Sequence, residues 1–71
     1  MVDTIGAALA AWRSRMGYLI REAAAYANVD HAQWSKWESG ALDVSALNRD
    51  KLVRAGVLSA DEAKLPRLAA A

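Results

Sequence analysis

The chain has 71 residues, of which 55% are hydrophobic and 24% charged, with one His, one Pro and no Cys. A chain of this length holds one domain, so residues 1–71 are expected to share a single core. Without Cys there can be no disulfide or thiolate metal site, and one His provides no nucleophile–base pair. No enzyme, metal or cofactor is therefore expected. The formal net charge of +1 is lower than that of an obvious nucleic-acid binder.

The N-terminus, Met1-Val2-Asp3-Thr4, lacks the basic region of a signal peptide. No apolar run approaches the ~20 residues that span a bilayer. We therefore expect a cytoplasmic protein with no membrane segment. Apolar volume is small, because 17 residues are Ala and none is Phe. Small cores of this kind often depend on oligomerisation, which favours a homodimer.

Helix-forming residues dominate and the alternation typical of strands is absent, so the sequence predicts an all-α fold of five short helices. Asp3 or Thr4 can cap the first helix, and Gly17 ends it. Gly6 is a mild weakness inside this helix. Its buried stripe is expected to contain four residues: Ile5, Leu9, Trp12 and Met16.

A second helix is expected over about Ile20–Ala27 and a third over about His31–Ser39. Between them, Asn28 suits the left-handed conformation that closes a helix. Asp30 is a strong N-cap for the third helix, and Gln33 stands where a capping-box partner would be. The two helices are therefore joined by a tight turn.

The third helix is expected to end at Gly40, with Trp34 and Trp37 sharing its buried face. After a loop, Ser45 can cap a fourth helix that reaches Ala55. A glycine directly after Ala55 is typical of a helix C-terminus.

A short fifth helix is predicted from the capping box Ser59-Ala60-Asp61-Glu62, and Pro66 stops it. The apolar tail Pro66–Ala71 is expected to fray or to pack on a partner. The C-terminal helices, residues 45–65, serve packing and dimerisation in this interpretation. Four apolar residues in or near this region are expected at the dimer interface: Val57, Leu58, Leu65 and Leu68.

The segment from Gly17 to Gly40 has the helix, turn and helix of a helix-turn-helix. The stretch GYLIREAAAYANVDHAQWSKWESG resembles the Cro and phage-repressor (Xre-type) motif, G-L-[ST]-Q-x-E-L-A-x-x-x-G-[VI]-[ST]-x-x-x-[IV]-[ST]-x-[IWL]-E-x-G. The following positions match without a gap: Gly17, Glu22, Ala24, Val29, Ser35, Glu38 and Gly40. The resemblance implies a lambda-repressor-like domain with its helix-turn-helix over about residues 19–39. The ending W-x-x-W-E-S-G is similar to that of small phage and mobile-element regulators.

The sequence departs from this motif at several positions of the second helix and the turn, including Ala23 and Ala27, which stand at two usual Leu positions. Leu19 stands where the family has a Ser or Thr cap, and Ile20 stands where it has Gln. The usual Gly is Asn28, which tolerates the same conformation. Because Gln is missing, the resemblance no longer implies the one phosphate contact that this Gln makes in the family, but the implied fold is unaffected.

The resemblance implies double-stranded DNA as the partner, read at an inverted-repeat operator. Four residues of the third helix take the positions that face base edges: His31, Ala32, Gln33 and Lys36. Lys36 would pair with guanine, Gln33 with adenine, and Ala32 with a thymine methyl group. Phosphate contacts are implied at four further positions: Arg15, Arg21, Ser39 and Ala41.

Each of these residues also has a structural interpretation. Lys36 on an exposed helix face is a solvated charge in most proteins, and His31 is an ordinary first-turn residue. Gln33 can simply complete the cap with Asp30. The Trp pair is interpreted as core and not as a stacking platform.

Arg13 stands four residues before Gly17, as the corresponding Arg does in the family, where it pairs with the position of Glu38. The resemblance therefore implies an ion pair that ties the first helix to the end of the third. Arg13 would then not neutralise DNA charge, which leaves Arg15, Arg21 and Lys36 near the motif. Because these are few cations for tight binding, two subunits are expected.

These patterns together indicate a sequence-specific transcriptional regulator, a homodimeric repressor of a phage or mobile-element promoter. Its half-sites would lie about one helical turn, ~34–36 Å, apart. The alternative is a protein-binding adaptor or inhibitor that uses the helix-turn-helix fold without specific DNA binding, which the near-neutral charge favours. No small-molecule ligand is expected in either case.

Overall fold

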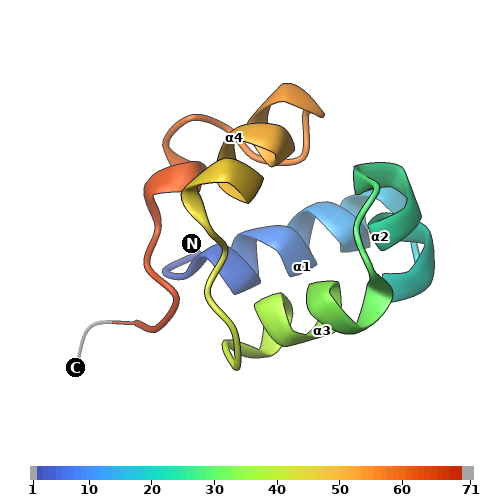
Figure 1. The fold of residues 1–71 in the computed structure, drawn as a ribbon, viewed down its shortest axis with the longest axis horizontal. Coiled ribbons are helices and arrows are strands. Elements are labelled where there is room, and N and C mark those ends of the chain that lie inside the picture. Colours follow the sequence, from blue (N-terminus) through green and yellow to red (C-terminus); the bar gives the residue numbers. More distant parts are fainter. Residues whose placement is uncertain (1, 70–71) are drawn as a thin grey trace.

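The computed structural model describes residues 2–69, which form four α-helices and one turn of 3-10 helix (Figure 1). The elements are α1 (Ile5–Met16), α2 (Ile20–Ala27), α3 (His31–Ser39), α4 (Ala46–Arg54) and η1 (Glu62–Lys64). These residues contain no strand, so the all-α prediction is confirmed for them. α3 packs against α1 and α2, while η1 packs against α1 and α4.

The helix boundaries follow from local capping chemistry. Thr4, Asp30 and Ser45 are N-caps whose side chains each accept a backbone N–H hydrogen bond of 3.0–3.2 Å. Gln33 takes no part in the Asp30 cap among the hydrogen bonds of residues 2–69, so the predicted capping box is only half present. Left-handed residues end the first three helices: Gly17 at φ 71°, Asn28 at φ 58° and Gly40 at φ 81°.

The predicted fifth α-helix is a single 3-10 turn, η1. Its capping box is complete, since Ser59 Oγ accepts from the Glu62 N–H at 3.1 Å and Glu62 Oε1 accepts from the Ser59 N–H at 2.9 Å. Leu65 nevertheless takes an extended conformation, with ψ at 146°. Pro66 imposes this, because its ring disfavours the helical conformation of the residue before it.

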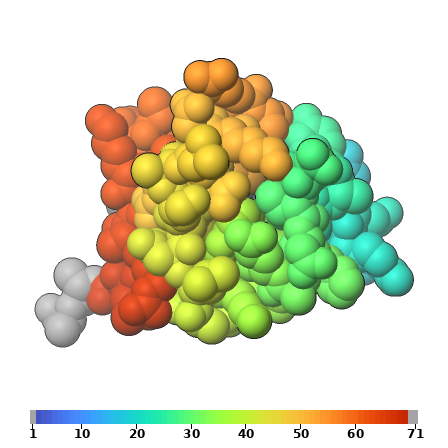
Figure 2. Space-filling model, in the orientation of Figure 1, coloured from blue at the N-terminus to red at the C-terminus, as the bar shows by residue number. Residues whose placement is uncertain are grey.

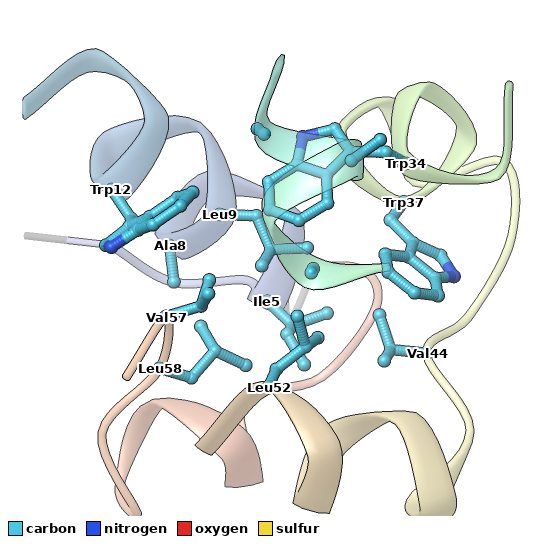
Figure 3. Packing of buried hydrophobic residues seen from close by; sticks show 13 residues of the cluster. Ile5, Ala8, Leu9, Trp12, Trp34, Trp37, Val44, Leu52, Val57 and Leu58 are labelled. Atoms are coloured by element: carbon cyan, nitrogen blue, oxygen red, sulfur yellow. The ribbon is translucent and has the colours of Figure 1, made fainter. Parts of the chain in front are cut away.

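Thirteen buried residues form one core, whose largest fully buried members are Trp34 and Trp37, 0% and 1% exposed (Figure 3). Met16 was expected in the stripe of α1 but is 46% exposed, so the stripe ends at Trp12. The buried residues are Ile5, Ala8, Leu9, Trp12, Ala23, Ala24, Ala27, Trp34, Trp37, Val44, Leu52, Val57 and Leu58.

Two of the residues predicted at a dimer interface belong to this core. Val57 and Leu58 are 2% and 4% exposed, because the left-handed Gly56 turns the chain back after α4 and the Val57 N–H bonds to Leu52 O at 2.9 Å. Leu65 is half-buried against the core. The prediction that Val57 and Leu58 lie at a dimer interface is therefore wrong, and Leu68, which is 57% exposed, is the one member of the set on the surface.

The C-terminal segment contacts its own domain at Pro66, Arg67 and Leu68, although these residues are exposed, and residues 70–71 of the predicted tail lie outside the described chain. Pro66 O accepts a hydrogen bond from the Ile5 N–H at 3.0 Å. Arg49 fastens the segment before it, because its guanidinium donates to Ala63 O at 2.8 Å and to Leu65 O at 2.7 Å. No pattern in the sequence singles out Arg49 for this role.

Candidate nucleic-acid interface

Arg13 and Glu38 form a bidentate ion pair that joins α1 to the end of α3. Arg13 Nε donates to Glu38 Oε2 at 2.7 Å and Nη2 donates to Oε1 at 3.0 Å, while Nη1 donates to Tyr18 O at 3.2 Å. Trp34 Nε1 donates to the same Glu38 Oε2 at 2.5 Å. The hydrogen bonds that Arg13 donates to Glu38, together with the negative charge of Glu38, raise the pKa of Arg13 despite some desolvation. The ion pair implied by the family resemblance is thus present.

The link between α2 and α3 is short, and the Asn28 and Val29 N–H groups in it are hydrogen-bonded to α2. The Val29 N–H bonds to Ala24 O at 2.9 Å and the Asn28 N–H to Ala25 O at 3.1 Å, the pattern of a Schellman motif. Lys51 of α4 supports the turn from outside, because its Nζ donates to Asn28 O at 2.9 Å. These bonds fix the direction in which α3 leaves α2.

Opposite the buried tryptophans, α3 presents an exposed stripe along its whole length. The members stand at helical spacing and are small or cationic: Ala32, Ser35, Lys36 and Ser39. Ala32, Lys36 and Ser39 were predicted DNA contacts, and Ser35 was not. Ser35 could have been predicted, because it stands three residues after Ala32 and therefore on the same helix face.

His31 and Gln33 lie on either side of this stripe. His31 is exposed and Gln33 is half-buried. His31 shares a shallow surface groove with Arg21 from the first turn of α2, so the structure brings a predicted base contact and a predicted phosphate contact together. The groove is lined by Leu19, Ile20, Arg21, His31 and Ser35.

The two predicted phosphate-binding positions at the C-terminal end of α3, Ser39 and Ala41, are hydrogen-bonded to each other. Ser39 Oγ donates to Lys36 O at 3.2 Å and accepts from the Ala41 N–H at 3.3 Å. Both bonds are long, and both residues are exposed. A phosphate oxygen at this point would compete with weak internal bonds rather than strong ones.

Few basic side chains remain available for an anionic partner. Within residues 2–69, five take part in internal hydrogen bonds or salt bridges: Arg13, Arg49, Lys51, Arg54 and Arg67. Four take part in none of these contacts: Arg15, Arg21, Lys36 and Lys64. Arg15 lies in the last turn of α1 and is not among the residues that line the groove beside α3.

Comparisons with protein-family models, with curated proteins and with solved structures give no match for this chain. Across residues 2–69, no helix has the length and apolar character needed to cross a membrane. The same residues contain no group of three or more metal-ligating side chains placed to hold an ion. Function is therefore inferred from the α2–α3 surface itself.

Proposed function

We propose that this protein is a cytoplasmic, non-enzymatic regulator that binds double-stranded DNA in a sequence-specific manner. Its helix-turn-helix of the lambda-repressor type would place α3 in the major groove, with α2 across the backbone. The observation that carries the proposal is the exposed stripe of α3, held in a fixed orientation by the buried tryptophans and by the Arg13–Glu38 ion pair. Small residues in this stripe allow close approach to base edges, and Lys36 supplies the positive charge.

Selection of binding sites from random duplex DNA is the direct test. The proposal expects an enriched inverted repeat whose half-sites lie about one helical turn apart. Titration of the selected duplex at two salt concentrations should then give a steep salt dependence, because phosphate binding releases counterions. Failure to enrich any sequence, with no binding of random duplex at low salt, would refute the proposal.

Lys36→Ala is expected to weaken binding to the selected duplex by ~1–3 kcal/mol, with a smaller loss on random DNA, because Lys36 would pair with guanine. The fold should persist, since Lys36 is exposed. Lys64→Ala is the matched control, because it removes the same charge from η1, which packs against α1 and α4. Equal losses on the selected and random duplexes would show that Lys36 contacts phosphate and not a base.

The proposal includes a homodimeric repressor, because three free cations near the motif supply few phosphate contacts per subunit. Leu68 is the one residue of the predicted interface that is exposed. Leu68→Asn is expected to raise the monomer fraction in sedimentation velocity and to weaken binding to the inverted repeat more than to a single half-site. A neutral replacement is used because an added carboxylate would itself repel DNA. Wild-type protein that stays monomeric with and without DNA would exclude the dimer.

A protein-binding adaptor is the second candidate, and one observation favours it. The groove beside α3 is partly apolar, and Leu19 in its lining is 61% exposed. A protein partner would bury such a leucine, whereas phosphate would not. The salt titration separates the two candidates, because an apolar protein contact lacks the steep dependence that phosphate contacts give.

A further inference from the structure

The C-terminal segment brings Arg67, the sixth arginine of the chain, to the end of α3. After η1 the chain passes the start of α1, where Pro66 O accepts from the Ile5 N–H. It then reaches the segment that follows α3, and the two segments lie side by side on the surface in Figure 2. Arg67 Nη1 donates to Gly40 O at 2.7 Å, and a Leu68 methyl carbon lies 3.3 Å from where a Gly40 Cβ would stand.

The guanidinium of Arg67 is only partly used by this bond. Arg67 is exposed, and the bond to Gly40 O is its one side-chain hydrogen bond within residues 2–69. A guanidinium carries five N–H donors in a rigid plane, so four remain. Such a plane, fixed at one edge, can present its other donors to a phosphate with little loss of side-chain entropy.

The position of Arg67 changes the electrostatics at this end of α3. The C-terminus of a helix carries a partial negative charge on its free carbonyl groups. A phosphate that approached Ser39 and Ala41 would meet those carbonyls and would be repelled. Arg67 binds the Gly40 carbonyl directly and adds a full positive charge beside it. The end of α3 therefore becomes favourable to an anion.

The dimensions of α3 bring this end to the DNA backbone in the proposed complex. Nine residues give a helix about 13.5 Å long, whereas the major groove is about 12 Å wide. The N-terminal residues of a recognition helix lie at base edges, so its C-terminal end lies toward the wall of the groove, where the phosphates are.

We infer that Arg67 is a phosphate-binding residue, held against the C-terminus of α3 to clamp the DNA backbone where that helix leaves the major groove. The inference rests on the proposed function and adds to it a contact from the C-terminal segment. It also raises the cations near the DNA surface from three to four per subunit.

The test is the salt dependence of binding by Arg67→Gln, on the selected duplex and on random duplex. Affinity should fall about tenfold on both duplexes. The slope of log K against log salt, which is negative, should become shallower by about 0.9 for each phosphate that Arg67 neutralises. Arg67→Lys should keep most of the wild-type slope, because it keeps the charge. Arg54→Gln is the matched control, since it neutralises an exposed arginine at the end of α4 and should leave the slope unchanged.

A purely structural role for Arg67 would lower thermal stability and leave the salt slope as it is, and that result would overturn the inference. An equal change of slope in Arg54→Gln would overturn it as well, because the effect would then be one of net charge. In both cases the wild-type protein still binds DNA, so the proposed function stands. Wild-type protein without salt-dependent binding would remove the proposed function and the inference together.

Discussion

Replacing Gly6 with Ala is expected to destabilise the domain and lower its melting temperature, although Ala is the better helix former. A Cβ at Gly6 would lie 2.8 Å from Glu38 O and closer still to Trp37 O. Both obstacles are backbone atoms of α3, so no side-chain rotation can relieve the overlap. The replacement would gain about 1 kcal/mol in helix propensity. The forced separation of α1 from α3 should cost ~3 kcal/mol or more, because the packing around Gly6 is opened.

Gly17→Ala is the matched control for this experiment. Gly17 has a left-handed conformation at φ 71°, but no atom outside its immediate neighbours lies within 4 Å of its added Cβ. Its replacement should therefore cost only the conformational ~1–2 kcal/mol. Circular dichroism melts of both variants give the comparison. A Gly6→Ala protein that melts at or above the wild-type temperature would show that α1 and α3 do not approach this closely.

Gly6 also shows why part of the fold could not be predicted. In the sequence it is a glycine inside a helix, and the only local principle that applies counts it as a weakness. Gly6 stabilises the fold because its lack of a side chain lets α1 approach residues 37 and 38, which lie more than thirty positions further along the chain. No periodic pattern records where the backbones of two helices will meet.

The helix boundaries, in contrast, were predictable because they depend on neighbouring residues alone. Thr4 and Asp30 cap the N–H groups two or three residues ahead of them, and Asn28 turns left-handed at its own position. Val57 and Leu58 were misassigned for the opposite reason. Their local pattern is a glycine followed by apolar residues, and only the tertiary fold shows that the turn directs them into the core.

The candidate interface likewise contains residues that the sequence could predict and residues that it could not. The α3 stripe, including Lys36, follows from helical spacing once α3 is assigned. The position of Arg67 beside α3 could not be predicted, because its partner is the backbone carbonyl of Gly40. Every residue has a backbone carbonyl, so no sequence pattern identifies this partner. The Arg13–Glu38 ion pair was predicted from a family resemblance and not from spacing, since the two residues lie 25 positions apart.

Removing either member of the Arg13–Glu38 pair should bring the protein close to unfolding. The side chains are 27% and 12% exposed, so the pair is partly shielded from water. Truncation of one partner in a buried pair strands the other charge and typically costs ~3–5 kcal/mol, and this partly buried pair should lie at the lower end of that range. A domain of this size has about 5 kcal/mol to lose in total. Arg13→Met and Glu38→Met alone are therefore each expected to melt far below the wild-type protein.

The double variants separate the charge pair from the rest of the network. Arg13→Met with Glu38→Met removes both charges and should recover much of the stability, but it leaves the buried Trp34 N–H without an acceptor. Arg13→Met with Glu38→Gln should recover more, because the amide oxygen can still accept from Trp34. An unpaired buried donor costs ~1–3 kcal/mol, which sets the expected difference between the two double variants.

Circular dichroism melts and urea titrations of the two single and two double variants provide the measurement. A coupling energy of several kcal/mol between positions 13 and 38 is expected, because each single change removes the same interaction. If the single variants melt within a few degrees of wild type, or if their effects simply add, the side chains are not paired in solution. Arg13 would then be free to neutralise a phosphate. The salt slope of DNA binding would fall in Arg13→Met, whereas a paired Arg13 leaves that slope unchanged in the stable double variants.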